Sequence, residues 1–144
     1  MSRRLARERA LMVLFQVDVG NADPEKAFVW MDDAFGILNK NDDFARHLVS
    51  SVLANRQAVD QVIAGLSKDW KFDRVAGVDR NIMRMALYEI FYCPDVPGNV
   101  AVNEAVELAK TYGSDDSGRF INGILGKVLE KPEDYAPAGA LAKQ

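Results

Sequence analysis

The sequence has little cysteine or histidine, and it contains no long apolar run. Its 144 residues include one cysteine, Cys93, and one histidine, His47. An internal disulfide is therefore impossible, and the common zinc sites lack their Cys and His ligands. No apolar stretch approaches the roughly 20 residues of a membrane span, and the start of the chain does not resemble a secretion signal. We therefore expect a cytoplasmic protein without a metal ion or other cofactor and without membrane contact.

Residue patterns of common catalytic sites are also missing. The glycines in the last third of the chain do not follow a strand and lack the lysine and serine or threonine that end a phosphate-binding loop. We expect the Gly-x-x-Gly run at 123–126 to permit close helix packing. The acidic pairs at 32–33, 42–43 and 115–116 point about 100° apart on a helix, and at helix starts such pairs serve as caps. A structural role is the stronger interpretation for the imidazole of His47. The sequence therefore gives no support for an enzyme.

Apolar residues recur at helical spacing, and no segment alternates with the period of two that a half-buried strand needs. The fold class is therefore all-α, a compact helical bundle with short antiparallel connections. Helices are predicted over about 3–19, 24–36, 42–66 with a bend near Asn55, from Asp79 to Pro94, through Val102 to Gly113, and from 114–117 to Pro132. We expect Asp23 and Asp79 to cap the helices that they precede. One apolar stripe is predicted along the first helix, formed by Ala6, Ala10, Val13, Leu14 and Val17. We expect one domain over 1–131 and a flexible tail over 132–144.

Arginine is concentrated at the start of an otherwise acidic chain. The first nine residues contain four arginines and one glutamate, although the net charge of the protein is -3. Arg3, Arg4 and Arg7 are three and four residues apart and so share one side of a helix, whereas Arg9 points elsewhere and is expected to be solvated. Guanidinium groups bind phosphate bidentately and stack on bases. The cluster favours a nucleic-acid contact, with ordinary charged surface as the alternative.

A second candidate segment is SDDSGRF at 114–120. Its hydroxyls, carboxylates, arginine and aromatic ring can hold splayed single-stranded bases by hydrogen bonds to their edges and by stacking. In the structural alternative, Ser114 caps a helix, Phe120 belongs to the core and Arg119 is solvated. Both interpretations remain open on these residues alone.

Four segments resemble, in order, those of the bacterial NusB transcription antitermination family. They are RRLARERALMVLFQVD, VDRNIMRMALYEI, DVP followed by VAVNEAVELAKTYG, and DDSGRFINGILGK. The runs NEAVELAK at 103–110 and FINGIL at 120–125, in this spacing, are specific together. The resemblance covers most of the chain. It implies an all-helical protein of two small three-helix subdomains that has no catalytic activity.

The resemblance also implies a function and partners. Such a protein binds the boxA element of nascent, single-stranded RNA together with NusE, which is also a small-subunit ribosomal protein. The pair joins RNA polymerase and other Nus factors and supports antitermination, notably on ribosomal RNA operons.

The family's functional positions can be carried over residue by residue. The arginines near the start would hold the RNA backbone, and the second segment would contact bases. Phe15 stands where family members often have tyrosine. A hydroxyl contact to RNA would therefore be missing, whereas stacking on the ring could remain. NusE would dock on the other side, near Asp73 and Asp79. The RNA-binding positions implied in this chain are Arg3, Arg4, Arg7, Phe15, Asp116, Arg119 and Phe120.

Two other functions compete with this interpretation. The first is an RNA-targeting domain like the NusB-like region of some ribosomal-RNA cytosine methyltransferases; we expect the stand-alone factor because the sequence ends at Gln144 without a methyl-donor domain. The second is a helical scaffold that binds only proteins. For a scaffold, removing the amino-terminal charges would leave RNA affinity unchanged.

Overall fold

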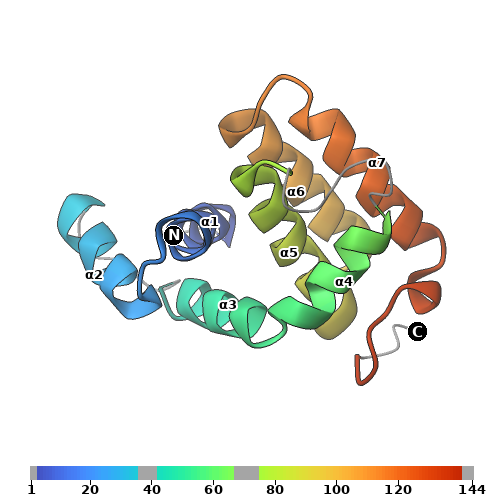
Figure 1. Cartoon of the computed structure of the whole chain (residues 1–144), viewed down its shortest axis with the longest axis horizontal. Helices are drawn as coiled ribbons and strands as arrows, with labels where there is room; N and C mark the ends of the chain where they lie inside the picture. Colours follow the sequence, from blue (N-terminus) through green and yellow to red (C-terminus); the bar gives the residue numbers. More distant parts are fainter. Residues whose placement is uncertain (1–2, 36–41, 67–74, 141–144) are drawn as a thin grey trace. The chain divides into compact units, whose positions relative to one another are not determined.

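The computed structural model describes residues 3–35, 42–66 and 75–140. The chain forms two compact units, Met1–Leu53 and Ala54–Gln144. Figure 1 labels their helices, and in the described ranges all regular structure is helical, with seven α helices and one short 3-10 helix. The predicted all-α class is therefore confirmed. No helix in these ranges combines the length and apolar character needed to cross a membrane.

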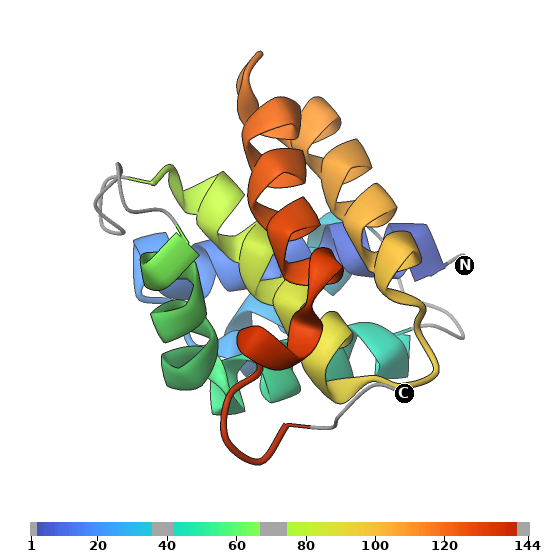
Figure 2. The ribbon, with the colours of Figure 1, turned by 90° about the vertical axis from the view of Figure 1, so that its right-hand side faces the viewer.

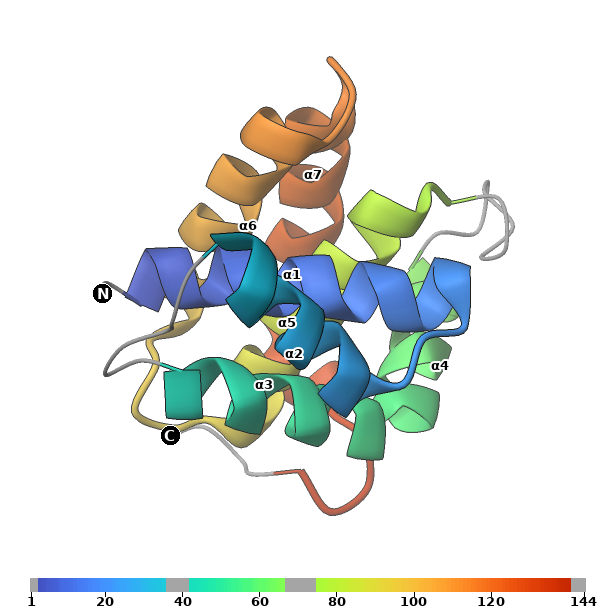
Figure 3. The same cartoon turned by 90° about the vertical axis from the view of Figure 1, so that its left-hand side faces the viewer.

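The first unit contains α1 (Arg3–Gly20), α2 (Pro24–Phe35) and α3 (Asp42–Ala54). Along α1, the predicted apolar stripe is buried from Ala6 to Leu14, and its last member, Val17, is half-buried. The helix ends where Asn21 adopts a φ of 55°, in the left-handed region. Asp23 then caps α2, because its Oδ2 accepts the backbone N–H of Lys26 at 3.1 Å. This short connection lets α2 pack on α1 (Figure 3).

One arginine links α2 to α3. The Nη1 atom of Arg46 on α3 donates to Oε1 of Glu25 at 2.6 Å, and its Nη2 lies 3.6 Å from Oδ2 of Asp32. The same guanidinium lies 4.6 Å from the ring centroid of Phe28. The side chain therefore joins the two helices through charge and through a cation–π contact.

The second unit contains α4 (Arg56–Leu66), α5 (Gly77–Tyr92), α6 (Gly98–Tyr112), α7 (Ser117–Glu130) and the 3-10 turn η2 (Pro132–Asp134). Helix α5 is its centre, because every residue of 81–91 is buried. Contacts join α5 to α4, α6 and α7, and Figure 2 shows α5, α6 and α7 side by side. A helix that is buried all round is a core helix.

The predicted bent helix over 42–66 is two helices. A turn at Asn55 separates α3 from α4, and the carbonyl of Asn55 accepts the N–H of Val59 at 3.1 Å. Asparagine favours such a break because its side chain competes for backbone hydrogen bonds. The second unit accordingly has four α helices within the described residues, where three were expected.

An ion pair between a buried arginine and a partly exposed aspartate joins α4 to α5. Arg84 donates from Nε to Oδ1 of Asp60 at 2.7 Å and from Nη2 to Oδ2 at 2.8 Å. Its Nη1 donates to Oδ1 of Asn81 at 3.0 Å, and Nδ2 of Asn81 donates to the carbonyl of Gly77 at 2.8 Å. Arg84 and Asn81 are both buried, so this network supplies hydrogen bonds that water cannot.

Replacing Asp60 with alanine should lower the free energy of unfolding by about 3 kcal/mol, because the buried charge of Arg84 loses its partner. Urea denaturation followed by circular dichroism measures the change. Asp95→Ala, which removes an exposed carboxylate, is the matched control and should change stability by less than about 0.5 kcal/mol. Equal effects of the two substitutions would contradict a structural role for the pair.

Gly123 and Gly126 of α7 do not serve helix packing. A Cβ atom built on Gly123 or Gly126 would meet nothing within 4 Å. The expectation that the Gly-x-x-Gly run allows close packing is therefore wrong for these residues. Gly113, by contrast, has no room, since a Cβ there would lie 2.5 Å from Oγ of Ser117 and 2.8 Å from the carbonyl oxygen of Ala109.

Gly126→Ala should raise the free energy of unfolding by about 1 kcal/mol, because alanine loses less backbone entropy in a helix and no neighbour obstructs its methyl group. Gly113→Ala should lower it, because the backbone carbonyl cannot move aside. Thermal melting of the two variants measures both signs. Destabilisation by Gly126→Ala would show that this face of α7 is not open.

Candidate nucleic-acid interface

The amino-terminal arginines are arranged around an aromatic ring. The guanidinium carbon of Arg3 lies 4.6 Å from the ring centroid of Phe44, and that of Arg7 lies 5.6 Å from it. Arg3 and Arg4 are exposed, whereas Arg7 is only 6% exposed. The cluster therefore does not present three equivalent arginines to solvent. Two reach outward, and the third packs within the first unit beside Phe44.

Phe44 is a residue whose role the sequence analysis missed. It stands at the start of α3, far along the chain from α1, so no local spacing connects it to the arginines. Stacking on an aromatic ring holds a guanidinium plane in a fixed orientation. Arg3 therefore presents its donors from a supported position rather than from a freely rotating side chain.

Two other residues of α1 belong to the sequence predictions. Phe15 has an exposed fraction of 36%, so its ring is accessible for stacking. Arg9 is half-buried, and its Nε and Nη1 atoms have no hydrogen-bond partner among the described residues. The expectation that Arg9 is simply solvated is therefore wrong.

The turn between α6 and α7 fixes the second candidate segment. Ser117 is buried, and its Oγ accepts the backbone N–H of Ser114 at 2.9 Å and lies 3.1 Å from the Oγ of Ser114. Ser117, and not Ser114, supplies the oxygen that satisfies a backbone amide. The close approach of Gly113 to Ser117 keeps the turn tight.

Asp116 does not cap α7 with its side chain, so the expected capping role is wrong at this position. Its Oδ1 instead accepts from Nη2 of Arg119 at 2.9 Å. Both side chains are 84% exposed. An ion pair exposed to this degree is weak, so a ligand can engage either group at little cost.

Beside this segment lies a pocket of about 540 Å³. Asp116, Ser117, Arg119 and Phe120 line it together with Asp79 of α5, and Ser114, Val75 and Ala76 complete the lining. The expected separation between Asp79 and the RNA-binding segment is therefore not found, because they share one pocket. Asp73, the other residue predicted to contact a protein partner, lies outside the described residues.

Asp79 is the least expected member of this pocket. It is 8% exposed, and its Oδ1 has no hydrogen-bond partner within the described part of the chain. The prediction that Asp79 caps the helix is wrong, since the cap residue is Ala76 and no side chain bonds there. A buried acceptor without a donor is costly in a folded protein.

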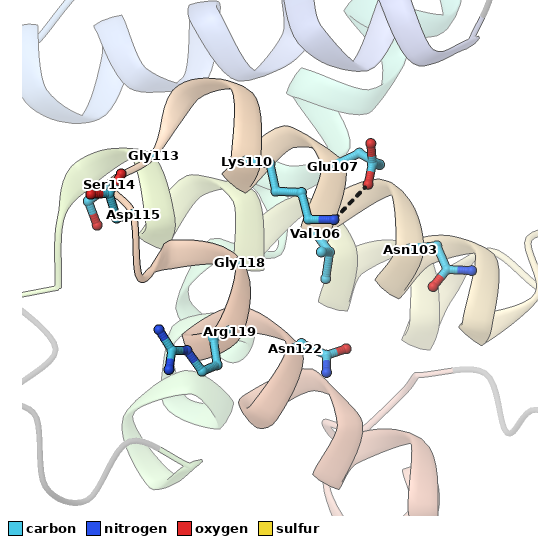
Figure 4. A pocket seen from close by; sticks show the side chains of 10 residues that line it. All are labelled: Asn103, Val106, Glu107, Lys110, Gly113, Ser114, Asp115, Gly118, Arg119 and Asn122. Carbon is cyan, nitrogen blue, oxygen red and sulfur yellow. Dashed lines mark hydrogen bonds and ion pairs between the residues drawn. The ribbon is translucent and has the colours of Figure 1, made fainter.

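A second pocket, of about 620 Å³, lies between α6 and α7. Figure 4 shows Val106 and Lys110 projecting from α6 toward the backbone of Gly118 on α7. Lys110 is held by Glu107, with 3.5 Å between Nζ and Oε2. Arg119 lines both pockets and so stands on the ridge between them. In the described ranges, no group of three or more His, Cys, Asp and Glu side chains is placed to hold a metal ion.

Comparison with known proteins identifies the family. The NusB family model matches residues 4–130. A transcription antitermination protein NusB from Pelotomaculum thermopropionicum is 66% identical over 137 residues, which are 95% of each chain. The chain belongs to the NusB family. Among solved structures, NusB of T. maritima has a TM-score of 0.81 at 32% identity and covers 91% of this chain and 92% of its own.

A solved complex of the antitermination factors NusB and NusE with double-stranded RNA also matches. Its similarity has a TM-score of 0.78 at 26% identity, over 89% of this chain and 96% of that one. Within this NusB-family protein, the structure brings together Arg3 and Arg7 in one unit and Asp116, Arg119 and Phe120 in the other. Sequence reasoning could not have found Phe44, nor the pocket position of Asp79, because neither follows from local spacing.

Arg7→Ala should lower the free energy of unfolding by about 1–2 kcal/mol, because it removes a buried side chain and its cation–π contact. Arg4→Ala removes the same charge from an exposed position and should change stability by less than about 0.5 kcal/mol. Urea denaturation of both variants measures the difference. If the two variants were equally stable, Arg7 would have no supporting role in the first unit.

Proposed function

We propose that the protein is a transcription antitermination factor that binds boxA-type single-stranded RNA together with NusE. The observation that carries this proposal is its membership of the NusB family, with a fold shared by the solved complex of NusB, NusE and RNA. The exposed side chains support it, because both predicted segments present groups suited to RNA. The protein acts without catalysis or a cofactor, in the cytoplasm, with RNA polymerase and other Nus factors, notably on ribosomal RNA operons.

The two segments carry different parts of the contact. Arg3 and Arg4 hold phosphates, which supplies affinity but no sequence information. Arg7 supports them from its buried position beside Phe44. The exposed carboxylate of Asp116 and the guanidinium of Arg119 reach base edges, while the half-buried ring of Phe120 offers a stacking face. Phe15 adds a second accessible aromatic ring.

NusE is the proposed protein partner, as in the solved complex. A ribosomal protein that binds RNA is basic, and this chain carries 21 acidic against 18 basic residues. Opposite net charges speed the encounter of two proteins and disfavour like-charged competitors. Asp73 remains a predicted contact for this partner.

The decisive test compares fluorescence anisotropy of a boxA-containing single-stranded RNA with that of a scrambled RNA of equal length, each titrated with the protein and NusE at several salt concentrations. We expect a clear preference for boxA. Arg4→Ala should weaken binding to both RNAs and reduce the salt slope by about 0.7, the value for one lost phosphate contact on a single strand. Arg56→Ala, which removes an exposed charge from α4, should leave the slope unchanged.

The outcomes separate the competing functions. Equal affinity for both RNAs would show that the RNA-binding surface contacts phosphates without recognising the base sequence. Absence of RNA binding, with the NusE pair shown to form, would instead support a scaffold that binds only proteins.

A further inference from the structure

Helix α2 carries exposed apolar side chains on the side that points away from α1 (Figure 3). Its buried face consists of Ala27, Phe28 and Met31. Val29 and Trp30 lie on the other side, with exposed fractions of 51% and 56%, and no other large apolar side chain in the described ranges is as exposed as Trp30. Adjacent apolar side chains that remain in contact with water often mark a surface to which another molecule binds.

Two opposite charges stand at the ends of this apolar pair. Lys26 precedes Val29 by three residues, and Asp33 follows Trp30 by three, so the four side chains share one face of the helix. Both charged residues are exposed, and neither side chain has an ion pair or hydrogen bond with another described residue. We refer to Lys26, Val29, Trp30 and Asp33 as the α2 face.

The other carboxylates near this face are engaged elsewhere. Oε1 of Glu25 accepts from Arg46 at 2.6 Å, and Oδ2 of Asp32 lies 3.6 Å from the same guanidinium. Asp23 caps the helix. The α2 face therefore presents one charge of each sign. It is neither the cationic surface that attracts RNA nor the acidic surface that attracts a basic protein.

The order of these residues is complementary to its own reversal. Lys26 and Asp33 are equally far along the sequence from the midpoint between Val29 and Trp30. If two copies of α2 lie antiparallel across a two-fold axis at this midpoint, Lys26 of each copy faces Asp33 of the other, and the apolar pairs meet at the centre. A two-fold interface requires such self-complementarity, because each contact occurs twice with the roles exchanged.

We propose that the α2 face binds the α2 face of a second copy of this chain, with the two helices antiparallel. Val29 and Trp30 of both copies supply the apolar contact, and two ion pairs between Lys26 and Asp33 set the register and direction of the helices. Exposed ion pairs add little affinity, but like charges in their place oppose binding. One helix face buries less than a standard interface, so we expect a weak dimer with a Kd on the order of 100 μM.

The other candidate occupants are a nucleic-acid base and a basic protein segment, either of which can stack on Trp30. Asp33 would repel the phosphates of RNA, and Lys26 would repel a cationic segment, whereas a second copy meets both charges with their opposites. The charges therefore favour the second copy. The inference does not rest on the proposed function, because none of the candidate RNA-binding residues belongs to α2.

Sedimentation equilibrium of the wild-type protein, from about 5 to 500 μM, tests for the dimer. The average mass should rise with concentration from that of a monomer toward that of a dimer. Trp30→Ala should weaken this association at least about tenfold, because it removes the largest apolar contact. Val100→Ala, which truncates an exposed apolar side chain of α6, is the control and should associate as the wild type does. A wild-type protein that stays monomeric at every concentration would overturn the proposal.

Charge reversal tests the antiparallel register. Lys26→Glu places a carboxylate opposite Asp33, and Asp33→Lys places an ammonium group opposite Lys26, so each variant alone should associate at least about tenfold more weakly. An equimolar mixture of the two variants restores both opposite-charge pairs and should associate as tightly as the wild type. Both substitutions also suit the helix dipole, since they put negative charge in the first turn of α2 and positive charge in its last turn.

The mixture separates a charge contact from a structural disturbance. Loss of association in both single variants without recovery in the mixture would contradict the register and overturn the proposal. Association that both variants retain would place the dimer on another surface, with the same consequence. Circular dichroism verifies that each variant is folded, and should Trp30→Ala fail to fold, the charge variants still decide.

Discussion

The second unit depends on one constraint, which is that α5 is buried on all sides. Water cannot reach the polar groups along such a helix, so each must find a partner inside the protein. Arg84 meets this requirement with the carboxylate of Asp60 and the amide oxygen of Asn81. The same bonds attach α4 to the central helix, so the requirement for hydrogen bonding also determines how the helices pack. Asp79, at the amino end of α5, is the member of the helix that does not meet it.

The turn at 113–117 shows how packing and a binding surface are built from neighbouring residues. Gly113 leaves room for the Ser117 hydroxyl, and that hydroxyl satisfies the amide of Ser114. Because these small residues form the packing and the hydrogen bond of the turn, the longer side chains of Asp116 and Arg119 are not needed for it. They project into solvent beside the pocket, where they can contact a ligand without loss of fold stability.

Apolar periodicity, together with the residues that cap or end helices, predicted most of the helices from the sequence. The stripe from Ala6 to Leu14, the cap at Asp23 and the stop before Pro94 all depend on interactions within a few residues, and such interactions can be read locally. The break at Asn55 was predicted only as a bend, because a single asparagine in an apolar-periodic stretch does not decide between the two. The role of Phe44 and the buried state of Arg7 depend on contacts between helices, which no local pattern encodes. The capping assigned to Asp79 failed because α5 is capped at Ala76, three residues earlier. Asp116 does stand at the cap position of α7, but its carboxylate bonds Arg119 and no backbone amide of the helix.

The two ends of α7 differ in what holds them. The first turn is tied by the Ser117 bonds, whereas Gly123 and Gly126 follow with no side chains and no neighbours over their faces. Glycine weakens a helix locally, so backbone propensity contributes little to this half. Ile124, Leu125 and Val128 are buried there, and their packing supplies what the glycines do not. The carboxyl half of α7 is therefore held by the core on one face, while its other face stays free of side chains at two positions.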